Sequence, residues 1–189
     1  MNIVLIGFRC SGKSTVGEII AKKLKRTFID CDDYIEKKTH LSVREIFDIA
    51  GESYFRTLEG QAIADLSRLD GHVIATGGGA ILKRQNTKYL KRNGVLVLLD
   101  VTAKTAFERI AQDPKTRTRR PALTNYDPFV EVQQQMELRK AYYVEAADHV
   151  VQTDSREVED VVKDILTFLE GRGLGGPKGD NEQDEMAPL

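Results

Sequence analysis

Residues 7–14 read GFRCSGKS and match the pattern G-x-x-x-x-G-K-[ST]. The apolar run IVLI at residues 3–6 precedes this stretch, and apolar residues at helical spacing follow it from Val16 to Leu24. Because the pattern lies between an expected strand and an expected helix, it predicts a phosphate-binding loop. Glycines let backbone N–H groups converge on phosphate oxygens, and the N-terminus of the following helix adds partial positive charge.

Two side chains of this loop have the chemistry to act on ATP. Lys13 can reach the β- and γ-phosphates, and the hydroxyl of Ser14 can bind Mg²⁺. The alternative is a glycine turn capped by Ser11, which the strand and helix on either side disfavour. We expect ATP to contact Cys10, Ser11, Gly12, Lys13, Ser14 and Thr15.

Short apolar runs alternate with longer amphipathic stretches along the chain. This alternation is typical of βαβ units and a parallel sheet, so the sequence predicts an α/β fold. We expect strands over residues 3–6, 28–30, 73–76, 95–99 and 149–152. We expect helices over residues 13–26, 43–69 with a break near Gly51, 82–92, 103–111, 129–147 and 157–170.

The composition is that of an ordinary globular protein. The chain has 189 residues, of which 41% are hydrophobic and 30% charged, which suits one domain with its own core. No apolar run is long enough to span a membrane, and a net charge of −1 gives no general attraction for nucleic acid or acidic membranes. The only cysteines are Cys10 and Cys31, and no signal-peptide pattern begins the chain. We therefore expect a reduced, cytoplasmic protein, a monomer without a nucleic-acid or membrane partner.

Two segments differ in composition from the rest of the chain. Residues 112–127 are polar and basic and contain two prolines, which is typical of a long surface loop that is either a functional lid or disordered. Residues 171–189 are rich in Gly, Asp and Glu and are expected to form a disordered tail. The sequence therefore predicts a single domain over residues 1–170, with the lid at about 112–127.

A phosphate-binding loop occurs in switches, motors and kinases, so other features must separate these classes. A guanine-nucleotide switch needs an N-K-x-D element, which the sequence lacks. Residues 48–51 match D-x-x-G, but they lie in a helical pattern and not at the end of a buried strand. The short chain and the basic segment favour a kinase that acts on a small molecule.

Acidic residues follow the second expected strand, at the edge where open α/β sheets bind ligands. The stretch reads Asp30-Cys31-Asp32-Asp33, and strand alternation places Asp30 and Asp32 on the same side. One of them can hold Mg²⁺ through its waters, and the other can accept or orient a hydroxyl proton. Alternatively, Asp32 or Asp33 caps the following helix.

Glycines and arginines complete the candidate acceptor site. Residues 77–79 are three consecutive glycines after the third expected strand, where backbone N–H groups without side chains can face a ligand. Arg56 and Arg139 carry the planar group that binds a carboxylate through two hydrogen bonds. Taken separately, the glycines can form a loose turn, and each arginine can be solvated on the surface beside an i,i+3 partner. Together they suggest an acceptor that carries both a carboxylate and hydroxyl groups.

These motifs together resemble the shikimate kinase family. In chain order they read GFRCSGKST, FIDCDDYIE, GESYFRTLE, ATGGGA, RRPAL and LRKAYYVEAAD, and they cover residues 1–170. The resemblance implies a P-loop kinase fold of the nucleoside-monophosphate-kinase type, with a central five-stranded parallel sheet flanked by helices and a mobile lid. It also implies ATP-dependent phosphorylation of shikimate at its 3-hydroxyl, which gives shikimate 3-phosphate and ADP in the chorismate pathway of aromatic amino-acid biosynthesis.

The resemblance further implies roles for individual residues. The shikimate-binding set is Asp32, Arg56, Gly77, Gly78, Gly79 and Arg139. Asp32 is the candidate base near the reacting hydroxyl, and Lys13 and Arg120 complete the catalytic set. Arg120 resembles the lid arginine that closes on the ATP phosphates. Ser14 and Asp30 would serve Mg²⁺, with Asp30 acting through a water molecule.

Some positions depart from the family's pattern. Cys10 stands where the family commonly has glycine, so the loop must adopt its shape with a side chain there. Residues 120–123 read RPAL in place of the usual R-P-L, and residues 153–158 lack the proline often found near the adenine. None of these departures removes a charged group that the reaction needs.

Two other functions remain open at this point. The first is another small kinase of the same fold, with a gluconate or nucleotide acceptor, against which the three glycines and the two arginines argue. The second is a non-catalytic ATP-binding partner protein. Such a protein usually loses a charged residue of the site, whereas this chain keeps Lys13, Asp30, Asp32, Arg56, Arg120 and Arg139.

Overall fold

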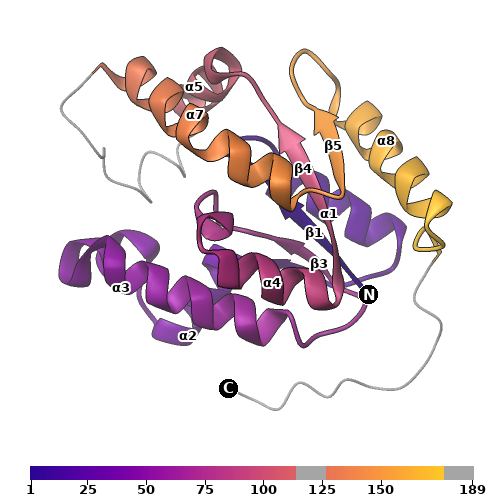
Figure 1. Cartoon of the computed structure of the whole chain (residues 1–189), viewed down its shortest axis with the longest axis horizontal. Helices are drawn as coiled ribbons and strands as arrows, with labels where there is room; N and C mark the ends of the chain where they lie inside the picture. Colours follow the sequence, from indigo (N-terminus) through magenta and orange to yellow (C-terminus); the bar gives the residue numbers. More distant parts are fainter. Residues whose placement is uncertain (114–126, 177–189) are drawn as a thin grey trace.

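Within residues 1–113 and 127–176, which the computed structural model describes, five strands form one parallel sheet (Figure 1). The strands are β1 (Asn2–Ile6), β2 (Phe28–Asp30), β3 (Val73–Ala75), β4 (Gly94–Asp100) and β5 (His149–Gln152). Their order is β2-β3-β1-β4-β5, so β1 lies at the centre. The expected five-stranded parallel sheet is confirmed, with small differences at the strand ends.

Helices supply the crossovers that parallel strands need. They are α1 (Lys13–Lys23), α2 (Cys31–Thr39), α3 (Val43–Leu66), α4 (Arg84–Arg92), α5 (Ala103–Gln112), α7 (Pro128–Ala146) and α8 (Val158–Gly171). A 3₁₀ turn, η1 (Ala80–Leu82), follows β3, so α4 begins at Arg84 and not at residue 82 as predicted. For α2 the sequence predicted only that Asp32 or Asp33 could cap a helix after the second strand, and it gave no bounds for that helix.

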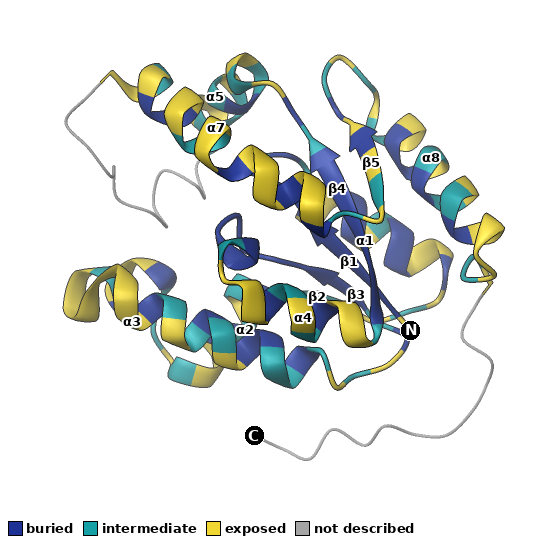
Figure 2. Cartoon of the chain, viewed as in Figure 1, coloured by how far each residue is buried: buried dark blue, intermediate teal, exposed yellow. Residues whose placement is uncertain are grey.

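Both faces of the sheet are covered by helices. Ile3 and Leu5 of β1 pack on one face with apolar residues of α1 and α8. Val4 and Ile6 pack on the other face with residues of α2, α3, α4 and α7. Figure 2 accordingly shows β1 in the colour of buried residues along its length. This double coverage is the reason that the strand sequences read as continuous apolar runs.

Helix α3 is interrupted where the sequence predicted a break. Ser42 caps its N-terminus by accepting a hydrogen bond from the backbone nitrogen of Glu45. Gly51 has φ 75° and ψ 176°, which are not helical angles, and it divides the helix into two segments. The D-x-x-G match at residues 48–51 therefore ends at the break between two helical segments and does not follow a buried strand. The second segment begins at Glu52.

Two predicted segments extend beyond the described residues. Most of the predicted lid between α5 and α7, including Arg120, lies outside them. Near the C-terminus, Arg26 donates a 3.1 Å hydrogen bond to the carbonyl oxygen of Leu174, which packs on the core beside α1 and α8. The start of the predicted tail is therefore attached to the domain, and residues 177–189 are outside the described range. None of the described helices combines the length and apolar character that crossing a membrane requires.

Candidate active site

The phosphate-binding loop connects β1 to α1, and Gly12 directly precedes the helix. Three of its residues have positive φ angles, which are 143° at Gly7, 59° at Cys10 and 99° at Gly12. A Cβ atom at Gly7 would lie 2.5 Å from the carbonyl oxygen of Leu99, so this position needs glycine. Cys10 adopts the left-handed conformation that glycine takes more easily, and the loop keeps its shape with a thiol side chain there.

The ammonium group of Lys13 is held against the backbone of this loop. Its Nζ donates hydrogen bonds to the carbonyl oxygens of Gly7 at 2.9 Å and Phe8 at 2.7 Å. The side chain is buried, and these carbonyl oxygens replace the water that the charge loses. Lys13 therefore brings a positive charge to the loop at which the sequence predicts that the nucleotide phosphates bind.

Asp30 ends β2, and its two carboxylate oxygens have different partners. Oδ2 accepts a 2.7 Å hydrogen bond from the hydroxyl of Ser14. Oδ1 accepts a 2.9 Å hydrogen bond from the backbone nitrogen of Asp32 and caps α2. Burial, and after it the negative charge of Asp32, raises the pKa of the Asp30 carboxyl. Ser14 and Asp30 thus place two hard oxygen donors side by side, an arrangement that fits Mg²⁺.

The prediction for the acidic cluster was wrong in two details. The cap of α2 is Asp30, whereas the sequence suggested Asp32 or Asp33. Strand alternation also does not determine the side on which Asp32 lies. Helix α2 begins at Cys31, directly after β2, so Asp32 is part of a helix and not of the strand. Asp32 lies instead in the first turn of the helix, close enough for its charge to affect Asp30.

Residues 77–79, named here the glycine triplet, pack their backbone against two other parts of the site. A Cβ atom at Gly78 would lie 3.2 Å from the backbone nitrogen of Arg9 in the phosphate-binding loop. A Cβ atom at Gly79 would lie 2.5 Å from Nη1 of Arg56. Backbone hydrogen bonds then continue the triplet into η1. The loose turn considered as an alternative is therefore wrong, because the triplet is closely packed.

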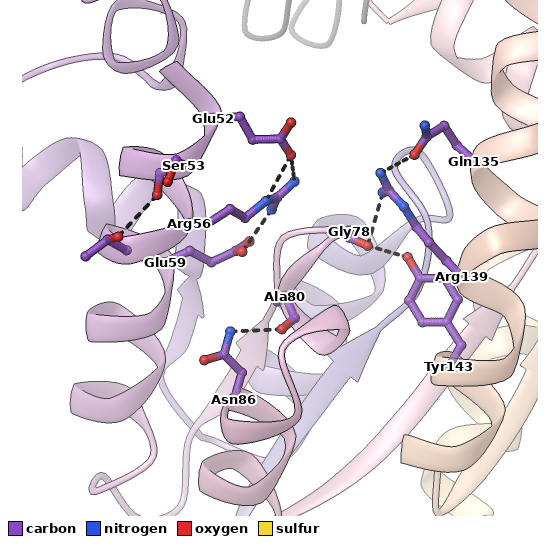
Figure 3. A network of polar contacts seen from close by, with 11 residues as sticks. Glu52, Ser53, Arg56, Glu59, Gly78, Ala80, Asn86, Gln135, Arg139 and Tyr143 are labelled. Atoms are coloured by element: carbon purple, nitrogen blue, oxygen red, sulfur yellow. Dashed lines mark hydrogen bonds and ion pairs between the residues drawn. The ribbon is translucent and has the colours of Figure 1, made fainter. Parts of the chain in front are cut away.

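Arg56 lies on the second segment of α3 and is held by two carboxylates (Figure 3). Its Nη1 donates to Oε2 of Glu59 at 2.9 Å, and its Nε and Nη2 donate to Oε1 of Glu52 at 3.2 and 2.8 Å. Burial acts to lower the pKa of Arg56, but the charges and hydrogen bonds of Glu59 and Glu52 outweigh burial and raise it. The guanidinium is therefore a permanent cation beside the glycine triplet.

Arg139, on α7, lies on the opposite side of Gly78 from Arg56 (Figure 3). Its Nη1 donates to the carbonyl oxygen of Gly78 at 3.4 Å, and its Nη2 donates to Oε1 of Gln135 at 2.7 Å. The hydroxyl of Tyr143 also donates to the Gly78 carbonyl oxygen. Tyr143 was not among the predicted site residues, although its spacing of four residues from Arg139 puts both on one helix face. Arg139 is buried, which excludes the alternative of a solvated surface arginine.

Two further arginines that the sequence alone did not indicate connect the loop to its surroundings. Nη2 of Arg109 donates to the carbonyl oxygen of Thr153 at 2.8 Å, and its Nη1 donates to the carbonyl oxygen of Cys10 at 3.4 Å. Nη2 of Arg9 lies 3.8 Å from Oε1 of Glu131 on α7. Both connections join residues far apart in the chain, so no local pattern could reveal them.

The structure thus brings two kinds of group together at one edge of the sheet. Lys13 lies in the phosphate-binding loop, while Arg56 and Arg139 lie on either side of a triplet that packs against that loop. Ser14 and Asp30 supply oxygen donors at the same edge. Such a site can hold a nucleotide triphosphate next to a small anionic acceptor. The fold and the site therefore define a P-loop kinase that acts on a small molecule.

Proteins of known identity specify the family further. The family model described as shikimate kinase matches residues 9–170. A shikimate kinase of Symbiobacterium thermophilum is 38% identical over 176 residues, which are 93% of this chain and 100% of that protein. A solved structure described as shikimate kinase from Acinetobacter baumannii in complex with shikimate has a TM-score of 0.85 and 32% identity, and the match covers 92% of this chain and 94% of that one. The chain belongs to the shikimate kinase family, as its motifs predicted.

We predict that Gly79→Ala selectively weakens acceptor binding. The new Cβ atom would lie 2.5 Å from Nη1 of Arg56, so the guanidinium must move away from its position beside the triplet. Displacement of a positioning group by about 1 Å is costly, and we expect the KM for shikimate to rise about tenfold or more. Steady-state assays of ADP release, with each substrate varied in turn, measure this effect.

The matched control for this substitution is Gly171→Ala at the end of α8. A Cβ atom there would have no atom within 4 Å outside its chain neighbours and the backbone of its own helix, so both KM values should stay as in the unmodified protein. If Gly79→Ala raises the KM for ATP as much as the KM for shikimate, the assignment of Gly79 to the acceptor site is wrong.

Proposed function

We propose that the chain transfers the γ-phosphoryl group of ATP to the 3-hydroxyl of shikimate, a step of aromatic amino-acid biosynthesis. The hydroxyl oxygen forms a bond to the γ-phosphorus while the bond from that phosphorus to the β–γ bridging oxygen breaks. The hydroxyl proton leaves to a base. The products are shikimate 3-phosphate, ADP and a proton.

The observation that supports this acceptor most strongly is the position of Arg56 and Arg139. Their guanidinium groups lie on opposite sides of Gly78, and the backbone of Gly78 packs against the phosphate-binding loop (Figure 3). Two guanidinium groups beside bare glycine backbone suit a carboxylate together with ring hydroxyls. Shikimate carries both of these groups.

Asp32 is the proposed base for the reacting hydroxyl. It lies in the first turn of α2, where the partial positive charge of the helix N-terminus stabilises a negative side chain. Its neighbour Asp30 caps the same helix and accepts the hydroxyl of Ser14, so the acceptor and phosphate sides meet at this turn.

The remaining charged residues of the site act on the phosphate groups of ATP. Phosphoryl transfer depends on positioning and on neutralising the charge of the γ-phosphoryl oxygens. Lys13 brings one positive charge from the phosphate-binding loop. We propose that Arg120 adds a second charge from the lid, and that closure of the lid excludes water and limits hydrolysis of ATP.

We propose that Mg²⁺ accompanies ATP and is held by Ser14 and, through water, by Asp30. The 2.7 Å contact between their oxygens supports this proposal, because Mg²⁺ prefers hard oxygen ligands and keeps several waters. When bound with ATP, Mg²⁺ neutralises charge on the phosphate oxygens.

We propose a cytoplasmic monomer whose partners are its small-molecule substrates, without a nucleic-acid or membrane partner. The small net charge of −1 supports the expected absence of a nucleic-acid or membrane partner, since it gives no general attraction for polyanions.

The proposed reaction is tested with a panel of acceptors in the presence of ATP and Mg²⁺. We expect release of ADP that depends on shikimate, with phosphorus NMR showing one phosphate monoester. Rapid ADP release with gluconate or a nucleoside monophosphate, and none with shikimate, would establish another kinase of the same fold. Binding of ATP without turnover of any acceptor would indicate the non-catalytic ATP-binding protein.

We predict that Asp32→Asn nearly abolishes turnover in a protein that stays folded. Asparagine is close in size to aspartate but cannot accept the hydroxyl proton, and loss of a general base costs about 100-fold or more in kcat. Single-turnover kinetics measure the chemical step, and urea denaturation checks the fold. Asp33→Asn is the matched control, because Asp33 is the other acidic residue of the same helical turn. Turnover of Asp32→Asn close to that of the control contradicts the assigned role.

A further inference from the structure

We infer that Glu52 is a displaceable counter-ion of Arg56, which holds the edge of the guanidinium that the acceptor carboxylate takes on binding. Binding of the acceptor then exchanges one carboxylate for another on Arg56. This inference rests on the proposed function, because it requires a carboxylate on the acceptor, and it adds a residue that sets the affinity for that carboxylate.

The two carboxylates on Arg56 differ in how firmly they are held. Glu59 is 1% exposed, and its Oε2 accepts a hydrogen bond from Nη1 at 2.9 Å. Glu52 is 52% exposed, and one of its oxygens, Oε1, accepts hydrogen bonds from both Nε and Nη2. Breaking the contact of Glu59 with Arg56 would cost a buried carboxylate its 2.9 Å hydrogen bond, whereas the exposed Glu52 can exchange its contact for water.

The surroundings of Arg56 leave the edge held by Glu52 as the place for a ligand. The guanidinium lies against the backbone of Gly79, since a Cβ atom there would be 2.7 Å from its central carbon atom. Glu59 already accepts from Nη1, one of the two nitrogens of the end edge. The side edge of Nε and Nη2 therefore offers both nitrogens for the two-bond geometry that carboxylates prefer, and Glu52 occupies it.

Charge favours exchange over simultaneous binding. Glu52 and Glu59 together already place two negative charges on one cation. A third carboxylate on Arg56 would meet repulsion from Glu52, which release of Glu52 toward solvent relieves.

The backbone at Gly51 gives Glu52 a place to go. Gly51 is not helical, and apart from its chain neighbours and the nearby backbone of its own helix no atom lies within 4 Å of the position where its Cβ would be. Glu52 starts the second segment of α3, so its charge remains at a helix N-terminus after it leaves Arg56. Displacement therefore requires no movement of the rest of the helix.

Calorimetric titration of Glu52→Gln with shikimate tests this exchange. Glutamine removes the competing charge, so we expect the Kd for shikimate to fall about two- to fivefold, the range that exposed ion pairs contribute. The Kd for the methyl ester of shikimate should not change, because the ester has no carboxylate to take the place of Glu52. Glu52→Ala should likewise lower the Kd for shikimate and leave the Kd for the methyl ester unchanged.

The matched control is Asp48→Asn. Asp48 accepts a 3.2 Å hydrogen bond from Nε of Arg44 with the same i,i+4 spacing on α3, and it is 57% exposed. Its substitution should leave the Kd for shikimate unchanged. If Glu52→Gln binds shikimate no more tightly than the unmodified chain, or if the ester gains affinity equally, the exchange does not occur. If the unmodified chain binds no shikimate, the proposed function itself is wrong.

Discussion

Gly78 has no side chain, and this absence lets the turn after β3 lie directly against the phosphate-binding loop. A Cβ atom there would come within 3.2 Å of the backbone nitrogen of Arg9 and 3.5 Å of the carbonyl oxygen of Gly7. The carbonyl oxygen of Gly78 points instead toward α7, where it accepts hydrogen bonds from Arg139 and Tyr143. One residue thus fixes the distance between the nucleotide side of the site and a helix of the acceptor side.

The cations Lys13, Arg56 and Arg139 already have hydrogen-bond partners in the protein before any ligand binds. Lys13 donates to carbonyl oxygens of its own loop, Arg56 to two carboxylates, and Arg139 to Gln135 and Gly78. Ligand binding therefore replaces existing contacts of these cations with new ones, because the positive charges are already in position. Such preorganisation lowers the cost of ordering side chains on binding, and it lets single carboxylates such as Glu52 set affinity.

Much of the fold could be predicted from the sequence, because its signals are local. The apolar runs of β1 and β4 read as strands since both sheet faces are covered, and the phosphate-binding loop follows from its glycines and position. The break at Gly51 was also foreseen, and the structure shows its positive φ of 75°. The family could be predicted from the combination of motifs, because no single motif would have specified it.

The missed features depend on where one element ends or on distant contacts. Asp30 caps α2 because β2 ends there with no loop, a detail of one residue that strand alternation cannot resolve. The contact of Arg109 with Thr153 joins residues far apart in the chain. Glu52 looks in the sequence like an ordinary i,i+4 partner of Arg56, and only the position of Gly79 beside the guanidinium gives it a further meaning.

The most direct test of the central constraint is calorimetric binding of both ligands to Gly78→Ala. The added Cβ atom should push the turn and the phosphate-binding loop apart, so we predict weaker binding of both shikimate and a non-hydrolysable ATP analogue. Unchanged affinity for either ligand, in a protein that is still folded, contradicts the claim that this one backbone contact positions both halves of the site.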